Sequence, residues 1–382
     1  MRIVVDENIL AVDDYFSSAG ELIKLPGRQI TNQVLLDADA LLVRSVTPVD
    51  EDLLKNTRVR FVGSATSGVD HVDLDCLKQH KIKFCDAQGC NAAAVVDYFF
   101  SAVALLRKQH QLPELPETFG VVGAGNVGGL LVRKLLELGC EVRINDPLLN
   151  AAQKSALKGA EFCNLERTMG ADVVSLHVPL TRSGPHKTSR LLNRENLGRL
   201  APGTILINTS RGEVICGTGL AELLSVRDDV FAVLDVWENE PLVGADLVSK
   251  AQLATPHIAG YSLEAKNRAT ATLAAELGKF FDMTPSPPSD TVLTDKAVDV
   301  AVTSLLANDD SWATEVLLSV LPLNELDAGF RELVSAKRGP AAFDSMRREL
   351  ASRREFSSHR VSAEKLTEEQ GRVLGCLGFQ ID

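Results

Sequence analysis

The sequence predicts an α/β protein with two doubly wound parallel-sheet domains and a smaller C-terminal α+β domain. Short β-branched runs alternate with helical stretches over residues 1–90, and the same alternation begins again near Phe119. Such alternation implies parallel sheets that are covered by helices on both faces. Three prolines within Asp282–Asp290 then mark a linker to a last part of different character. The length of 382 residues fits this arrangement, since one domain takes roughly 100–200 residues.

In the first domain, each expected strand is a short apolar or β-branched run, as in a sheet buried on both faces. The expected strands are Ile3–Val5, Ala40–Val43, Phe61–Gly63 and Ile82–Cys85, and the expected helices are Glu51–Lys55 and Asp73–His80. A longer helix is expected at Ala92–Gln109, with Asn91 as its N-cap. Because this helix is apolar around most of its surface, we expect it to be buried.

The second domain begins after Pro113 and Pro116, which end the long helix. Its expected strands are Phe119–Val122, Glu141–Asn145, Val173–Leu176, Thr204–Asn208 and Val230–Leu234, and the helical stretches between them include Val127–Leu138 and Gly219–Ser225. Strands joined by helical crossovers in this way are typical of a doubly wound nucleotide-binding domain.

A glycine-rich turn, G-A-G-N-V-G at Gly123–Gly128, lies between the first strand and the first helix of this domain. The first glycine permits a tight turn, the second lets a dinucleotide pyrophosphate approach the backbone, and the third allows close helix–strand packing. The helix N-terminus then presents free N–H groups to the phosphates. Asp146 ends the next strand about 20 residues further on, where a carboxylate bonds the ribose hydroxyls. Since this carboxylate would repel a 2′-phosphate, the sequence favours NAD over NADP.

Three further residues form a candidate catalytic set. Arg211, in N-T-S-R-G, follows a predicted strand end, and its guanidinium can bind a carboxylate through two parallel hydrogen bonds. His257, in T-P-H-I-A-G, is suited to accept a hydroxyl proton near neutral pH. Glu240, in E-N-E-P, could hold that imidazole in one tautomer and stabilise its cation. The set suits a nicotinamide-dependent oxidation of a hydroxy acid.

The composition argues against several other functions. A net charge of −11 disfavours nucleic acid as a partner, because phosphate backbones bind basic surfaces. The seven cysteines form no C-x-x-C pair, so we expect no disulfide framework and no metal site, and reduced thiols in the cytoplasm. The N-terminus is typical of a strand and not of a signal peptide. The longest apolar run, Ala92–Leu106, is interrupted by Asp97 and is shorter than the ~20 residues of a membrane span, so no membrane partner is expected.

The motifs, taken in order, resemble those of the D-isomer-specific 2-hydroxyacid dehydrogenases. After the glycine turn and Asp146 they are H-V-P-L-T at His177–Thr181, N-T-S-R-G-E, D-V-W-E-N-E-P and T-P-H-I-A-G. The resemblance implies a Rossmann NAD-binding domain and a flavodoxin-like substrate domain, with the active site between them. It also implies that Arg211 binds the substrate carboxylate and that Glu240 pairs with His257, which exchanges the proton. The expected cofactor-binding residues are Gly123, Gly125, Asn126, Val127, Gly128, Asp146, Ser175, Thr209, Ser210, Asp235 and Gly260.

Other segments resemble members of this family that oxidise a small phosphorylated 2-hydroxy acid. These are the N-terminal M-R-I-V-V-D-E-N-I-L, the segments Leu41–Thr47 and Gly63–Asp73, and the Arg-rich Phe343–Ser358. By this resemblance Ser45, Thr66 and Tyr261 contact the substrate, and the protein is a homodimer.

The expected domains are a substrate-binding domain at residues 1–92 plus 258–282, an NAD-binding domain at 93–257, and a C-terminal dimerisation domain at 283–382. Two alternatives stay open at this point. One is a dehydrogenase of phosphoglycerate or of another 2-hydroxy acid, and the other is an NAD-sensing binding protein like the corepressors built on the same fold.

Overall fold

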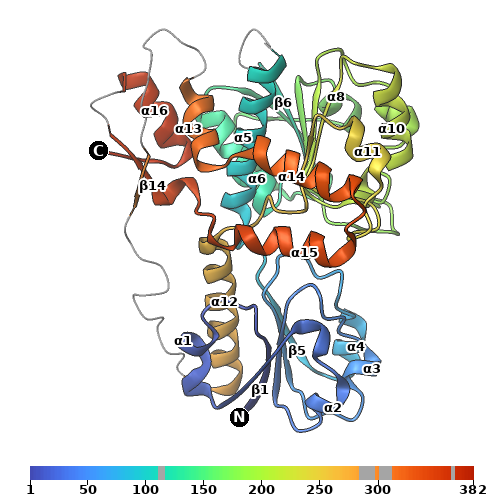
Figure 1. Ribbon diagram of the computed structural model, residues 1–382, viewed down its shortest axis with the longest axis vertical. Helices are drawn as coiled ribbons and strands as arrows, with labels where there is room; N and C mark the ends of the chain where they lie inside the picture. Colours follow the sequence, from blue (N-terminus) through green and yellow to red (C-terminus); the bar gives the residue numbers. More distant parts are fainter. Residues whose placement is uncertain (111–116, 284–296, 301–311, 363–365) are drawn as a thin grey trace. The chain divides into compact units, whose positions relative to one another are not determined.

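The computed structural model describes residues 1–110, 117–283, 297–300, 312–362 and 366–382. Contacts divide the chain into two units, Met1–Asn91 with Leu263–Asp295, and Ala92–Ser262 with Lys296–Asp382. Each unit contains a large parallel sheet (Figure 1). The expected α/β fold with two parallel-sheet units is thereby confirmed, while nearly all of the expected linker Asp282–Asp290 lies outside the described residues.

The sheet of the first unit has the strand order β2-β1-β3-β4-β5, which is that of a flavodoxin-like fold. Its strands are β1 (Arg2–Asp6), β2 (Glu21–Leu25), β3 (Ala40–Val43), β4 (Phe61–Ser64) and β5 (Lys83–Asp86), and its helices are α1 (Val12–Phe16), α2 (Asn32–Leu35), α3 (Glu51–Leu54), α4 (Leu74–Gln79) and α12 (Leu263–Phe281). Leu273 and Leu277 of α12 pack with Ile3 and Phe61 on one face of the sheet. Side chains of α2, α3 and α4 cover the other face, so the sheet is doubly wound.

Strand β2 is absent from the sequence-based prediction. It is an edge strand that pairs with β1, and none of its residues is fully buried. Charged residues on edge strands are common because they prevent pairing with other chains, and here Glu21 and Lys24 interrupt the apolar run that identifies the other strands.

The sheet of the second unit has the order β12-β11-β10-β9-β6-β7-β8, a Rossmann order with one added strand. Its strands are β6 (Thr118–Val122), β7 (Glu141–Asn145), β8 (Glu161–Phe162), β9 (Val173–Leu176), β10 (Ile205–Asn208), β11 (Phe231–Leu234) and β12 (Leu253–Ala254). Its helices are α5 (Ala92–His110), α6 (Asn126–Glu137), α7 (Ala151–Ser155), α8 (Leu165–Met169), α9 (Arg194–Leu197), α10 (Gly217–Val226) and α11 (Ala245–Lys250). Of these strands, the two-residue β8 and β12 are the ones that the sequence did not predict.

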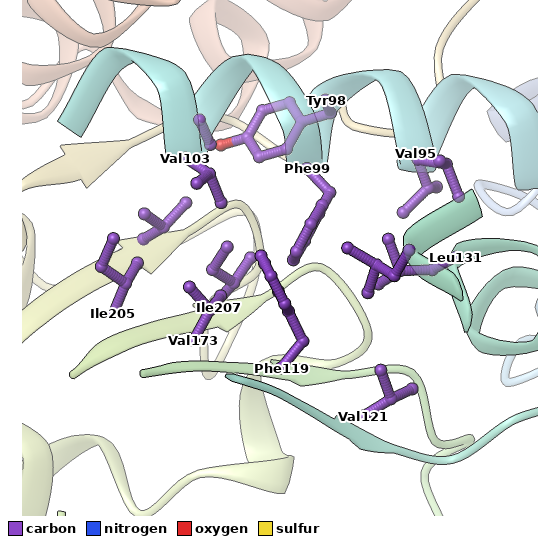
Figure 2. Close-up of a cluster of buried hydrophobic side chains, with 14 of the residues drawn as sticks. Val95, Tyr98, Phe99, Val103, Phe119, Val121, Leu131, Val173, Ile205 and Ile207 are labelled. Carbon is purple, nitrogen blue, oxygen red and sulfur yellow. The ribbon is translucent and has the colours of Figure 1, made fainter. Parts of the chain in front are cut away.

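Helix α5 is buried, as its apolar sequence predicts. Figure 2 shows the helix lying over the sheet, with the ring of Phe99 directed toward Phe119 and the strands beyond it. The two ring centroids are 6.2 Å apart. On the other sheet face, Leu220 of α10 and Val248 of α11 join the buried cluster around Leu206.

The described C-terminal residues form a three-stranded sheet and four helices (Figure 1). The elements are β13 (Val298–Asp299), α13 (Trp312–Val320), α14 (Leu323–Ser335), α15 (Gly339–Glu349), β14 (His359–Val361), α16 (Glu368–Leu377) and β15 (Gln380–Ile381). Phe330 of α14 and Phe343 of α15 are buried in the same cluster as Trp237 of the Rossmann part. Contacts thus group this segment with the second unit, and its role in dimerisation stays a prediction.

Candidate active site

The glycine turn joins β6 to α6, whose first turn contains Asn126 and Val127. Gly123 has a φ of +86°, and a Cβ on Gly128 would lie 2.0 Å from the Gly123 carbonyl oxygen, so both positions require glycine. A Cβ on Gly125 would meet no atom within 4 Å. The space beside Gly125 is therefore open to a ligand, and together with the N-terminus of α6 it fits a pyrophosphate.

Asp146 follows β7 and lies against this turn. Its Oδ2 accepts a hydrogen bond from the Ala124 N–H at 2.9 Å, and its Oδ1 accepts one from the Leu148 N–H at 3.0 Å. An ionised carboxylate has about four lone-pair sites, so the side chain can accept further hydrogen bonds. The position and the chemistry fit the predicted contact with the ribose hydroxyls.

Ser175 lies on β9 and is buried, with its Oγ 2.9 Å from Nε2 of His177. Burial lowers the pKa of His177 to about 4, so this imidazole is neutral near pH 7. The hydroxyl of Ser175 thus already has a partner within the protein, and its contact with the cofactor stays a prediction.

The loop after β10 is folded around the side chain of Asn208. Oδ1 of Asn208 accepts hydrogen bonds from the N–H and the hydroxyl of Ser210, and Nδ2 of Asn208 donates to the carbonyl of Arg211 at 2.9 Å. Within the described residues, Oγ1 of Thr209 is buried without a hydrogen-bond partner. An unsatisfied buried hydroxyl is destabilising, and a ligand bound beside it would supply the missing partner.

Gly212, the neighbour of Arg211, packs against the segment that carries Glu240. A Cβ on Gly212 would lie 2.0 Å from the carbonyl carbon of Trp237, so the two backbones are in direct contact. The guanidinium Nη1 of Arg211 donates to the carbonyl of Ser210 at 2.7 Å. The loop with the cation and the loop with the acid are therefore packed together within the second unit.

Glu240 and His257 form the hydrogen-bonded pair that the sequence predicts. Oε2 of Glu240 lies 2.7 Å from Nδ1 of His257, and Oε1 accepts the Trp237 N–H at 2.7 Å. Burial opposes ionisation of Glu240, but His257, the Trp237 N–H and Arg347 outweigh it and hold the pKa of Glu240 below its usual range. Since an ionised carboxylate only accepts hydrogen bonds, Nδ1 carries the proton that is shared with Glu240, and the neutral form of the imidazole, which acts as the general base, has its lone pair on Nε2.

Asp235 is completely buried and holds the loop that carries His257. Its Oδ1 accepts the Ile258 N–H at 2.8 Å and the Thr255 hydroxyl at 2.6 Å, and its Oδ2 accepts the Ala259 N–H at 2.9 Å. Its backbone carbonyl accepts the His257 N–H at 2.7 Å. In this structure Asp235 acts on the loop, and its expected contact with the cofactor stays a prediction.

Tyr261 follows Gly260 in the same loop and donates its N–H to the Ile258 carbonyl at 2.9 Å. The guanidinium carbon of Arg347, on α15, lies 5.1 Å from the centroid of the Tyr261 ring. The Arg-rich part of the sequence therefore contacts one of the residues that are predicted to bind substrate.

The other two predicted substrate contacts, Ser45 and Thr66, belong to the first unit. Ser45 is exposed just after β3, and Thr66 follows the neighbouring strand β4. The Thr66 hydroxyl donates to the Gly68 carbonyl at 2.8 Å and lies 2.7 Å from Oγ of Ser64. The structure thus brings both residues to the carboxyl ends of adjacent parallel strands, which is where open α/β sheets bind ligands.

Two buried charged residues beside the His257 loop were not predicted as site residues. Asp97 is buried on α5, and Arg353 is 8% exposed and donates to the carbonyls of Ile258 and Ala259. The one sequence signal for either residue is the charge of Asp97 inside an apolar run. These two carbonyl partners of Arg353 are 95 and 94 residues away in the chain, so no local spacing could indicate them.

One group in the described ranges has side chains that could ligate a metal: Glu51, Cys76 and His80, whose candidate ligand atoms lie within 4.8 Å of one another. Glu51 and His80 are already paired at 2.6 Å. Within the described part of the chain, no helix combines the length and the apolarity of a membrane span.

Comparisons with known proteins agree with this architecture. Residues 107–259 match the NAD-binding domain of the D-isomer specific 2-hydroxyacid dehydrogenases. The TT0316 protein of Thermus thermophilus is 27% identical, with a TM-score of 0.62 over 75% of this chain and 99% of its own. The NAD⁺-bound 3-phosphoglycerate dehydrogenase of Entamoeba histolytica is 24% identical, with a TM-score of 0.63 over 74% of this chain and 95% of its own, and it shows the shared fold.

Two curated relatives match over almost the whole length. The erythronate-4-phosphate dehydrogenase of Pseudomonas putida strain F1 is 41% identical over 391 residues, which cover 99% of both chains. The enzyme of the same name from Azotobacter vinelandii is 44% identical over 371 residues, which cover 94% of both. The chain therefore belongs to the D-isomer-specific 2-hydroxyacid dehydrogenases, with their NAD-binding domain, and within them to the family of erythronate-4-phosphate dehydrogenases.

Proposed function

We propose that this protein oxidises 4-phospho-D-erythronate to 3-hydroxy-2-oxo-4-phosphobutanoate with NAD as the hydride acceptor, a reaction of pyridoxal 5′-phosphate biosynthesis. The observation that carries the proposal is the identity of 41–44% to relatives named erythronate-4-phosphate dehydrogenase over 94–99% of the chain. The 3-phosphoglycerate dehydrogenase structure covers 74% of the chain at 24% identity. The described C-terminal residues group with the second unit, and they favour the first group of relatives, whose match covers 94–99% of the chain.

In the proposed reaction, Nε2 of His257 accepts the proton of the C2 hydroxyl as the C2 hydrogen departs as a hydride. Glu240 fixes the tautomer through Nδ1 and stabilises the imidazolium that forms, since their atoms are 2.7 Å apart. The balance is hydroxy acid plus NAD⁺ giving 2-oxo acid, NADH and one proton. A general base of this kind is worth about 10²–10⁴-fold in rate.

The two anionic ends of the substrate require separate recognition. We assign the carboxylate to the guanidinium of Arg211, which also polarises the developing carbonyl. Contacts from the hydroxyls of Ser45, Thr66 and Tyr261 complete the proposed set.

The cofactor would be held by the glycine turn, the N-terminus of α6, Asp146 and the unpaired hydroxyl of Thr209. When bound there, NAD supplies the hydride acceptor. The remaining proposed contacts come from Ser175, Ser210, Asp235 and Gly260.

The test is a comparison of substrates by NADH formation with the purified protein. We expect the highest kcat/KM with 4-phospho-D-erythronate, and the 2-oxo acid as the product detected by mass spectrometry. A higher kcat/KM with 3-phospho-D-glycerate would make the protein a phosphoglycerate dehydrogenase. Tight NAD binding without turnover of any 2-hydroxy acid would favour a binding protein.

We infer further that the protein works as a cytoplasmic homodimer. The inference about compartment rests on the seven cysteines, none of which is in a disulfide, as is typical of a reducing environment. The inference about the dimer rests on the resemblance of the Arg-rich C-terminal segment to a dimerisation domain. Sedimentation of the intact chain as a monomer at assay concentrations would contradict it.

A further inference from the structure

We propose that Arg353, in the C-terminal segment, is a positioning residue for the catalytic loop. It would hold the carbonyl groups that follow His257, so that the imidazole stays against Glu240. This inference rests on the proposed function of His257 and adds a role for a residue outside the Rossmann sequence. It makes the C-terminal residues part of the machinery that maintains the base.

The contacts of Arg353 are directed at the backbone of this loop. Nη1 donates to the Ile258 carbonyl at 3.3 Å and to the Ala259 carbonyl at 3.0 Å, while Nη2 donates to the Ala94 carbonyl at 2.8 Å. The side chain is 8% exposed. One guanidinium thus connects the catalytic loop to the start of helix α5.

Arg353 and Asp235 both form hydrogen bonds with the backbone of the same two residues. Asp235 accepts the N–H groups of Ile258 and Ala259, and Arg353 donates to their carbonyls. The N–H and carbonyl groups of both residues directly after His257 are therefore bound by buried, oppositely charged side chains.

The backbone of His257 explains why such a hold is needed. Its φ of +57° lies in the left-handed region, which a residue with a Cβ disfavours. Conformations of this kind persist where the surroundings enforce them, and they concentrate at functional sites. Loss of the Arg353 contacts would let the loop relax and turn the imidazole away from Glu240.

The segment that carries Arg353 is itself anchored by two hydrogen bonds at the residues that follow it. The Ser262 hydroxyl donates to Oε1 of Glu355 at 2.7 Å, and the Phe356 N–H donates to Oδ2 of Asp97 at 2.9 Å. Glu355 and Asp97 are both buried. The guanidinium is therefore presented to the catalytic loop by a segment with a defined position, as precise positioning requires.

The experiment compares Arg353→Met and Arg353→Lys with a matched control, Arg331→Met. Arg331, on α14, also donates to two backbone carbonyls of the second unit, those of Val248 and Ala251. Its targets are a residue in the last turn of α11 and the C-cap residue of that helix, to which no catalytic role is assigned. Each variant is measured by hydrogen exchange, by steady-state kinetics across pH, and by NAD titration.

We expect faster amide exchange across residues 257–262 in Arg353→Met and unchanged exchange there in Arg331→Met. For Arg353→Met, kcat should fall about 10–10²-fold, the effect of displacing a catalytic group by about 1 Å, while the Kd of NAD stays the same. The acidic limb of its pH–rate profile should move to lower pH, because Glu240 no longer stabilises the imidazolium. Arg353→Lys keeps the charge and part of the donor set, so it should recover part of kcat.

Equal losses of kcat in the Arg353 and Arg331 variants would overturn the proposal, as would an Arg353→Met protein with wild-type kcat and loop exchange. If Arg353→Met does not fold, Arg353→Lys decides the question by the same readouts. Hydrogen exchange needs no substrate. A wild-type protein that turns over no hydroxy acid would therefore refute the proposed function, while the exchange data would still decide whether Arg353 holds the loop.

Discussion

Replacing Glu240 by glutamine tests the coupling between the acid and the base most directly. In the native protein Oε1 of Glu240 accepts the Trp237 N–H, and Oε2 faces Nδ1 of His257. An N–H can only donate, so the glutamine must place its oxygen toward Trp237 and its NH₂ group toward the imidazole. That NH₂ donates to Nδ1 and shifts the ring proton to Nε2, where it blocks the base.

Two effects on the rate follow from this geometry. The wrong tautomer removes most of the general-base contribution, so kcat should fall by about 10²–10⁴-fold. The loss of a charged hydrogen bond, worth about 1.5–3 kcal/mol, destabilises the imidazolium. Because the His257 side chain is 32% exposed, solvent screens part of this loss, and the acidic limb should move to lower pH.

The assay is the pH dependence of kcat/KM for hydroxy-acid oxidation, with Glu238→Gln as the control. Glu238 lies two residues away in the same loop, so its replacement removes the same charge but leaves the pair intact. Its profile should match that of the wild type. An acidic limb that stays in place in Glu240→Gln, or one that moves equally in the control, would show that the pair does not set the protonation of the base.

Three further substitutions separate the parts of the site. His257→Asn should lose about 10²–10⁴-fold in turnover and keep its affinity for NAD in a fluorescence titration; near-normal activity would exclude His257 as the base. Asp146→Ser should weaken the binding of NAD and move the ratio of kcat/KM for NAD and NADP toward unity, because it removes the negative charge and the hydrogen bond from the Ala124 N–H. An unchanged ratio would show that another residue selects the cofactor. Burial raises the pKa of Asp97 to about 7. The contribution of this group to the free energy of unfolding is therefore fully present below about pH 4 and is lost as the pH rises through about 7. Between about pH 5 and 8 the Tm of Asp97→Asn should therefore rise relative to that of the wild type. The corresponding change in the free energy of unfolding is on the order of a few kcal/mol. Curves of Tm against pH that run parallel for the two proteins would contradict the assigned ionisation.

The sequence predicted the central strands well because their burial leaves a local trace. Strands such as β9 and β10 are buried along their whole length, and such strands are short apolar runs between polar loops. Strand β2 has no such trace because it lies at an edge, and β8 and β12 have two residues each. For elements of this kind the neighbouring strand, and not the local composition, determines the conformation.

In the candidate site, too, local motifs identify some residues, whereas other contacts depend on the fold. Glu240 and His257 are identified by residue type and motif, and the structure places their side chains 2.7 Å apart. The contacts of Arg353 depend on a segment that returns to the Rossmann part from far along the chain, and nothing in the local pattern distinguishes it from the neighbouring arginines. The hydrogen bonds of Asp235 could not be predicted either, because they depend on the exact course of the backbone after Pro256.

Gly125 and Gly212 show that one residue type can be retained for opposite reasons. A methyl group on Gly212 would collide with the backbone at Trp237, whereas one on Gly125 would extend into open space. Selection for folding alone would therefore preserve Gly212 and release Gly125. A library sorted first for expression and then for cofactor binding would separate the two positions, and only the second sort would reveal where the dinucleotide lies.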